Sequence, residues 1–180
     1  MTVATLRRGI PNDATCIGLL SIQVFLDTYA TEGIRPDLAR EALSEYSPAQ
    51  FYQRLRDENR SFILAEAGEG LLGFAEVLTK PSAPPAQGST RIGLELVRLY
   101  VQPSAQRAGL GRWLLRESER ICEGSGSEIL WLTVWSGNAR ALAFYRALGY
   151  VDTGASTYTF QGTSYENRVM IREMGGTDAA

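Results

Sequence analysis

The chain has 180 residues, a formal net charge of −2 at pH 7, a pI near 5.3 and no histidine. This length fits one domain, and the small net charge argues against general binding to nucleic acid or to acidic membranes. The missing histidine excludes Ser-His and Cys-His nucleophile pairs and most zinc sites, so any proton transfer falls to carboxylates, tyrosine, water or a thiol.

Neither a membrane segment nor an export signal is expected. No apolar stretch approaches the ~20 residues of a membrane helix, and the N-terminus lacks the apolar core of a signal peptide. Cys16 and Cys122 lie far apart in predicted helices, which is typical of reduced thiols and not of a disulfide or a metal pair. The sequence therefore predicts a cytoplasmic protein without a bound metal.

The N-terminal third predicts a strand and then helices. Residues 3–8 form the strand, and Asn12 or Asp13 can cap a helix that runs to about Tyr29. The predicted apolar face of this helix consists of Ile17, Leu19, Leu20 and Val24. Residues 36–57 then predict one or two further helices.

Three strands follow in the middle of the chain. Residues 61–67 and 71–78 predict a hairpin, residues 80–89 a proline-rich mobile loop, and residues 92–101 a buried strand. The apolar residues of this last strand fall into two sets of opposite parity, Ile92, Leu94 and Leu96 and then Val97, Leu99 and Val101. Because side chains alternate between faces, the switch indicates either a bulge near Val97 or Arg98 or a strand buried on both faces.

A glycine-rich segment joins this strand to an amphipathic helix over residues 110–123. The segment is Gln106-Arg107-Ala108-Gly109-Leu110-Gly111. Unpaired helix N–H groups, the positive end of the helix dipole and backbone without Cβ atoms together form a phosphate cradle. The spacing taken alone also fits a plain tight turn.

The C-terminal third predicts a strand from Ile129 and a helix over residues 138–148 with Gly149 just past its end. Residues 150–160 and 166–174 then predict paired strands. Residues 1–174 are therefore expected to form a single domain, followed by a flexible tail over residues 175–180.

Two motifs in this order resemble the GCN5-related N-acetyltransferases, which move an acetyl group from acetyl-CoA to an amine. The first is the glycine-rich segment after the strand that carries the parity switch. The second is a strand, Asn138, and a helix that ends in Phe144-Tyr145-Arg146-Ala147-Leu148-Gly149-Tyr150. The resemblance covers nearly the whole chain and implies an α/β fold with a splayed, mixed, mostly antiparallel sheet of about six or seven strands and helices on both faces.

The resemblance also implies acetyl-CoA as co-substrate, no metal, and a set of cofactor-binding residues. The backbone of the strand is expected to pair with the pantetheine arm, and the glycine-rich segment to hold the pyrophosphate. The residues implied are Leu99, Tyr100, Val101, Gln106, Arg107, Ala108, Gly109, Leu110, Gly111, Arg112, Asn138 and Tyr145. Asn138 could also be merely a helix N-cap, and a plain turn remains the alternative for the glycines.

Two residues are expected to transfer protons. Tyr145 is the predicted general acid for the departing CoA thiolate, whose thiol has a pKa near ~8.5 by analogy with cysteine, and packing in the core is its alternative role. Glu95 stands among apolar residues and is the predicted base for the attacking amine, whose reference pKa is about 10.4. The alternative for Glu95 is a salt bridge to Arg98 or Arg91.

The predicted reaction is direct attack of a primary amine on acetyl-CoA. Five residues could line the acceptor groove, with packing or solvated surface as the alternative for each: Tyr29, Glu32, Glu76, Trp135 and Tyr158. A small or polyamine-like acceptor is favoured, with an N-terminal protein acetyltransferase and a non-catalytic acyl-CoA sensor as alternatives. We expect no nucleic-acid or membrane partner, and a homodimer is the oligomer considered.

Overall fold

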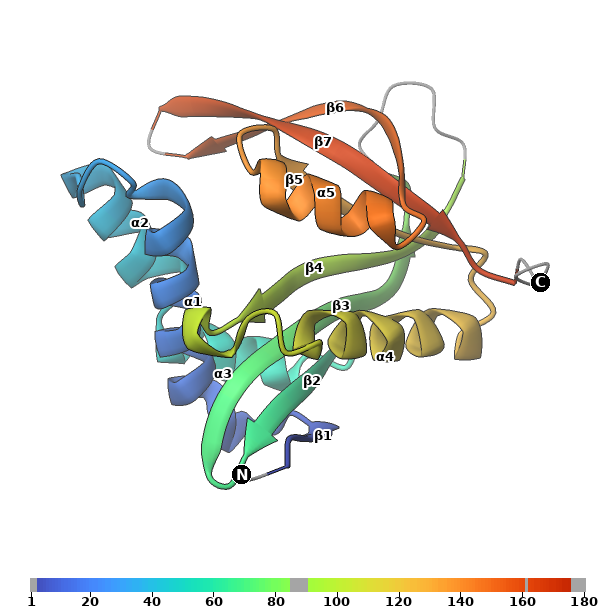
Figure 1. Cartoon of the computed structure of the whole chain (residues 1–180), viewed down its shortest axis with the longest axis horizontal. Helices are drawn as coiled ribbons and strands as arrows, with labels where there is room; N and C mark the ends of the chain where they lie inside the picture. Colours follow the sequence, from blue (N-terminus) through green and yellow to red (C-terminus); the bar gives the residue numbers. More distant parts are fainter. Residues whose placement is uncertain (1–2, 85–90, 161, 176–180) are drawn as a thin grey trace. The chain divides into compact units, whose positions relative to one another are not determined.

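The computed structural model describes residues 3–84, 91–160 and 162–175. Its strands are β1 (Thr5–Arg8), β2 (Arg60–Ala67), β3 (Gly70–Ser82), β4 (Gly93–Val101), β5 (Ile129–Trp135), β6 (Val151–Phe160) and β7 (Thr163–Glu173) (Figure 1). Its helices are α1 (Ala14–Tyr29), α2 (Pro36–Glu45), α3 (Pro48–Arg56), α4 (Leu110–Gly124) and α5 (Ala139–Ala147), with single turns η1 (Pro11–Asp13) and η2 (Pro103–Ala105).

The strands of the described residues form one sheet in the order β1-β2-β3-β4-β5-β7-β6. The pairs β1–β2, β5–β7 and β6–β7 are antiparallel, whereas β4 and β5 are parallel. This architecture confirms the predicted α/β fold with a mixed, mostly antiparallel sheet.

The chain divides into two compact units. The first comprises Met1–Val77 and Arg98–Ser118, and the second comprises Leu78–Val97 and Glu119–Ala180. Strands β3 and β4 and helix α4 contribute to both units. A single domain over residues 1–174 stays a prediction, and residues 176–180 of the predicted tail lie outside the described residues, as do residues 85–90 of the predicted mobile loop.

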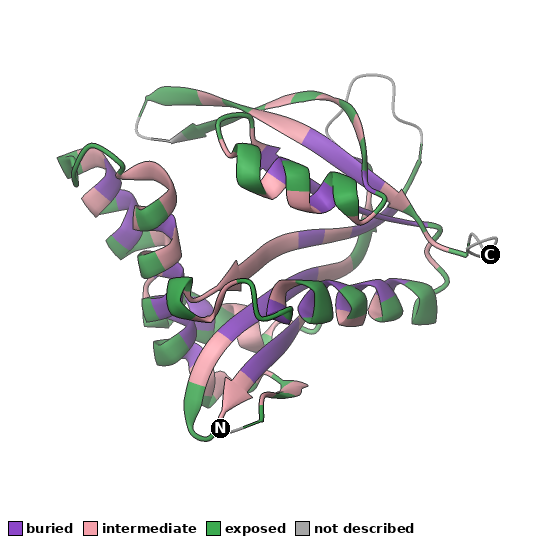
Figure 2. Cartoon of the chain, viewed as in Figure 1, coloured by how far each residue is buried: buried purple, intermediate pink, exposed green. Residues whose placement is uncertain are grey.

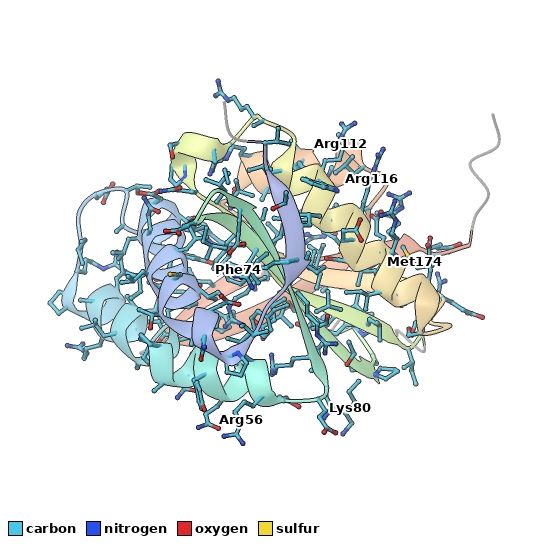
Figure 3. All side chains as sticks on the ribbon, turned by 90° about the horizontal axis from the view of Figure 1, so that it is seen from below. Arg56, Phe74, Lys80, Arg112, Arg116 and Met174 are labelled. Carbon is cyan, nitrogen blue, oxygen red and sulfur yellow. The ribbon has the colours of Figure 1, made fainter. Side chains whose placement is uncertain are left out.

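The core of the first unit is aromatic. Phe62 and Phe74 come from adjacent strands and stack with ring centroids 6.2 Å apart, and Phe51 from α3 meets both rings edge-on (Figure 3, where Phe74 is labelled). Edge-to-face and offset stacking are the arrangements that aromatic quadrupoles favour, so these rings fix how α3 packs against the sheet.

Helix α1 differs from its prediction in two details. Asp13 is the N-cap residue, as expected, but its carboxylate accepts hydrogen bonds from the Ile10 N–H and from Arg7, not from the first turn of the helix. The prediction that Leu19 lies on the apolar face is wrong, because its side chain is 62% exposed. Phe25, one turn after Ser21, takes the buried position instead.

Ile129, Trp131, Val169 and Ile171 form a buried cluster on one face of the sheet in the second unit, and a second apolar set lies on the opposite face. Register places Leu94, Leu130 and Arg172 on this face, and Leu132 and Met170 follow by alternation; the four apolar residues are almost fully buried (Figure 2). A Cβ at Gly93 would collide with the carbonyl of Ile129, so β4 and β5 can approach only because this residue is glycine.

Most element boundaries agree with the sequence patterns, and two strands are longer than predicted. Strand β3 extends to Ser82, whose carbonyl accepts a hydrogen bond from the Trp131 indole at 3.2 Å. Strand β7 begins at Thr163, because the hairpin register continues to the pair of Phe160 with Thr163. In both cases polar strand ends carry no apolar pattern, so pairing and not periodicity sets the boundary.

Candidate active site

The glycine-rich segment has an unusual backbone in the structure. Arg107 has φ +66° and is the one non-glycine residue with positive φ among the described residues, while Gly109 has φ +81°. Left-handed residues that alternate along a loop turn successive N–H groups toward one point and form an anion-binding concavity. Strain at a residue such as Arg107 is typical of functional sites. The segment therefore has a backbone that suits an anion, and its contact with a pyrophosphate stays a prediction.

Three hydrogen bonds and two positive charges lie in and around the glycine-rich segment of the first unit. The Gln106 amide donates to the Val101 carbonyl at 3.2 Å, and the Trp113 N–H donates to the Gly109 carbonyl at 3.0 Å, which opens α4. The Gln102 N–H donates to the carbonyl of Leu72 at 2.8 Å. Arg107 and Arg112 are exposed, and the latter extends outward from α4 (Figure 3). Helix N–H groups, a positive dipole end and two cations thus meet at one loop.

The end of β4 uses its side chains for packing. The Tyr100 ring lies edge-on to Phe74 with centroids 5.5 Å apart, and a Cβ at Gly73 would lie 2.7 Å from the Tyr100 carbonyl oxygen. Leu99 and Val101 are half-buried. Their predicted backbone pairing with a cofactor stays a prediction, and of these backbone groups the Val101 carbonyl already accepts the Gln106 amide.

Glu76 lies in a buried ionic cluster of the first unit. Its side chain is fully buried and bonds to Arg60 and, at 2.5 Å, to Arg98. Arg98 also bonds to Glu45 at 2.9 Å and lies over the Tyr46 ring at 5.6 Å. Burial opposes the charge of Arg98, but the Glu76 carboxylate together with Tyr100 and Tyr46 raises the pKa of the guanidinium. The cluster ties α2 and β2 to β3 and β4.

This environment disfavours the predicted role of Glu76 in the acceptor groove. A carboxylate without exposed surface and with two arginine partners has no free charge for a cationic substrate. The other two candidates of this unit differ: Tyr29 ends α1 with its ring 5.0 Å from Phe25, and Glu32 is exposed in the following turn. Their groove role stays a prediction.

Glu76→Gln is expected to destabilise the fold by about 1.5–3 kcal/mol, because hydrogen bonds to charged groups are worth that much. For a chain of this size the melting temperature should fall by roughly 2–4 °C per kcal/mol, measured by thermal melting. Glu69→Gln, at an exposed turn position, is the control and should melt like the unmodified protein. An unchanged melting temperature together with lost acceptor turnover would restore Glu76 to the groove.

In the second unit, strand register gathers three predicted residues on one face. Glu95 pairs with Trp131, which pairs with Ile171, so these side chains share a face. Alternation places Trp135 on the same face, and the β6–β7 hairpin adds Tyr158, which is 41% exposed. The structure therefore puts Glu95, Trp135 and Tyr158 on one face, which also carries the buried apolar cluster of Ile129, Trp131, Val169 and Ile171.

The two arginines considered as partners of Glu95 bond to other carboxylates. Arg98 bonds to Glu76 and Glu45, and Arg91 bonds to Glu173 at 2.7 Å. The base role and the salt-bridge role of Glu95 both stay predictions.

Sequence reasoning missed Asn167, which pairs with Trp135 and shares its face. The side-chain oxygen of Asn167 is buried and has no hydrogen-bond partner within the described part of the chain. The Tyr165 ring, also on this face, lies edge-on to Trp135 with centroids 6.3 Å apart. A buried oxygen without a donor is costly, so it marks a place where a ligand N–H would be stabilised. A lone Asn in a polar strand gives no sequence signal for this role.

The second motif places Asn138 and Tyr145 on α5. The Asn138 side chain accepts the Ala141 N–H at 3.0 Å, so it is an N-cap, and its cofactor contact stays a prediction. Tyr145 is 8% exposed, and its ring contacts Phe144 at 5.1 Å and Tyr150 at 5.5 Å. Core packing and a proton-donor role are both compatible with this placement.

Comparisons with known proteins agree with these motifs. The sequence model of the acetyltransferase (GNAT) family matches residues 26–150. The chain is 28% identical over 130 residues to the N-alpha-acetyltransferase RimI of Mycobacterium tuberculosis, which covers 72% of this chain and 77% of that protein. It is 29% identical over 109 residues to the streptothricin acetyltransferase of Streptomyces lavendulae, covering 61% of this chain and 53% of that protein.

A solved structure shares the fold. The PaiA N-acetyltransferase of Thermoplasma acidophilum, crystallised in complex with coenzyme A, superposes with a TM-score of 0.73 at 20% identity. The match covers 95% of this chain and 99% of that one. At this identity the likeness establishes the architecture alone.

Proposed function

Because the chain belongs to the acetyltransferase (GNAT) family, we propose that it catalyses N-acetyl transfer from acetyl-CoA to a primary amine. The family assigns the reaction class, and acetyl-CoA is the acetyl donor. The observation that carries the proposal is the loop over residues 106–111, where left-handed Arg107 and Gly109 lead into α4. Such a loop fits a pyrophosphate, because the loop offers several N–H donors and positive charge together.

Gly109→Asp tests the loop. The substitution puts a carboxylate against the cofactor phosphates, so the affinity for CoA should fall at least tenfold, measured by calorimetry, which is roughly 1.4 kcal/mol or more. Gly126→Asp is the matched control, since both glycines have similar positive φ and neither has a heavy atom within 4 Å of the point that a Cβ would occupy. Unchanged CoA affinity in folded Gly109→Asp would refute the pyrophosphate assignment.

Direct attack of the amine is favoured over an acyl-enzyme. The chain has no histidine to activate a nucleophile. Cys122 is fully buried and donates to the Ile129 carbonyl at 3.1 Å, and burial raises the pKa of its thiol to about 11. A thiol in this state is inert as a nucleophile at neutral pH.

The acceptor proposed is a small cationic amine. The side chains of Glu95, Trp135 and Tyr158 and the unpartnered Asn167 oxygen suit ammonium and amine N–H groups, because aromatic faces attract cations and carbonyl oxygens accept N–H. An N-terminal peptide amine is the second candidate, supported by the likeness to an N-alpha-acetyltransferase. Release of CoA thiol with 1,4-diaminobutane against an alanine tripeptide distinguishes them: faster release with the tripeptide would favour the peptide acceptor.

Location and assembly complete the proposal. None of the described helices is long and apolar enough to cross a membrane. A cytoplasmic location and a homodimer stay predictions, for which fractionation and light scattering are the direct measurements.

A further inference from the structure

A polar cluster with two buried members and the half-buried Arg172 lies at the C-terminal end of α5 in the second unit. One oxygen of Glu119, on α4, accepts hydrogen bonds from the Tyr150 hydroxyl at 3.2 Å and from Arg172, on β7, at 3.1 Å. The same Arg172 nitrogen donates to the Leu148 carbonyl at 2.8 Å. Tyr150 is 2% and Glu119 is 9% exposed. None of the roles assigned so far uses this cluster.

The cluster reaches Tyr145 through Tyr150. The two rings meet at a centroid distance of 5.5 Å and an interplanar angle of 64°. The Tyr150 N–H also donates to the Tyr145 carbonyl at 3.1 Å, because Gly149 turns the chain back with φ +84°. Tyr150 is therefore held at its hydroxyl by Glu119 and at its backbone by Tyr145. Its ring packs in this fixed orientation against the Tyr145 ring.

The charges of Glu119 and Arg172 and the burial of Tyr150 keep the cluster in one protonation state. Burial and the Glu119 carboxylate raise the pKa of the Tyr150 phenol, so Tyr150 keeps its proton and donates to Glu119 throughout the neutral range. Arg172 supplies the opposite charge and also bonds to a carbonyl at the negative end of the α5 dipole.

Fold stability alone is a weak reason for such a cluster. Buried charged groups pay a desolvation cost, and well-packed apolar side chains of similar volume stabilise a fold as well or better. Directional hydrogen bonds do provide a fixed geometry, which matters where a misplacement of ~1 Å can cost roughly 10²-fold in rate.

We propose that Glu119, Tyr150 and Arg172 are positioning residues, which orient the Tyr145 ring so that its hydroxyl can protonate the departing thiolate. This inference rests on the proposed acid role of Tyr145. It assigns to Glu119 a function in the reaction although this side chain lies on another helix and is linked to Tyr145 through Tyr150.

Tyr150→Phe is the first test, because it keeps the ring and removes only the bond to Glu119. We expect kcat to fall roughly tenfold while KM for acetyl-CoA stays unchanged, since orientation and not binding is lost. Glu119→Gln, which keeps the volume and removes the charge, should also lower kcat and serves as the second variant. Tyr52→Phe, at an exposed tyrosine of α3, is the control. Turnover is followed by thiol release with whichever of 1,4-diaminobutane and the alanine tripeptide reacts faster.

The decisive measurement is the double-mutant cycle with Tyr145→Phe. If Tyr150 acts through Tyr145, the double variant should be no slower than Tyr145→Phe alone. A slow Tyr145→Phe combined with a full-rate Tyr150→Phe, or with fully additive losses, overturns the positioning role and leaves the acid role intact. A full-rate Tyr145→Phe removes the acid role itself, so the two failures are distinguishable.

Discussion

Tyr145→Phe is expected to lower the rate of acetyl transfer by ~10²–10⁴-fold, the usual contribution of a general acid. The substitution keeps the ring that packs against Phe144 and Tyr150, so the loss is chemical and not structural. A phenol has a reference pKa of about 10, and the CoA thiol has one of about 8.5. The phenol can therefore protonate the thiolate only if the two groups are held together. Removal of the one hydroxyl oxygen of Tyr145 should suffice to abolish this proton transfer. The rate is measured as thiol release under conditions in which the chemical step limits turnover.

Two further measurements keep this result interpretable. The melting temperature of Tyr145→Phe should stay within a few degrees of that of the unmodified protein, and the affinity for CoA should change little. Tyr52→Phe removes a hydroxyl from an exposed tyrosine and should react at the full rate. Full turnover of Tyr145→Phe would leave this residue with a packing role only.

The elements with strong patterns were predictable from the sequence. Helix α4 and strand β5 begin within one residue of their predicted starts, because a long amphipathic period and a continuous apolar run each admit one structure. The cap at Asn138 and the left-handed Gly149 were also predictable, since few residue types satisfy those positions. These features are local, and short-range sequence carries them.

Features that depend on register were not predictable. The ionic cluster of Glu76 joins residues from four elements, and nothing in the local sequence states which strands become neighbours. The same holds for the shared face of Glu95 and Trp135, which follows only from the pairing of β4 with β5 and of β5 with β7. The left-handed backbone of Arg107 also lacks a sequence signal, because arginine has no preference for it.

The two groups of predicted site residues thus have different support. The proposed phosphate loop is a local feature of sequence and backbone, so its assignment rests on residues 106–111 and the φ angles of Arg107 and Gly109. The two predicted proton-transfer residues lie on β4 and α5, so their assignment depends on the family and on mutation. For Glu95, a pH profile can decide whether the carboxylate is the base for the amine or the partner in an ion pair.

Glu95→Gln is expected to lower turnover by ~10²-fold or more near neutral pH, because the acceptor amine then loses its base. A primary amine with a reference pKa near ~10.4 is almost entirely protonated at pH 7, and each unit of rising pH supplies about ten times more free amine without help from the protein. The variant should therefore regain much of its rate as the pH increases toward 9 or 10, while its affinity for CoA stays unchanged.

The competing role for Glu95 predicts the opposite pattern. If this carboxylate only stabilises the fold through an ion pair, Glu95→Gln should melt at a lower temperature and keep the pH–rate profile of the unmodified protein. Glu128→Gln, at an exposed position just before β5, controls for the loss of one negative charge. Both quantities are measured on one preparation, and a destabilised variant with an unaltered profile would assign Glu95 to structure. A steeper pH dependence at unchanged melting temperature would assign it to the chemistry. Rising pH supplies free amine, and free amine compensates only for the loss of a base.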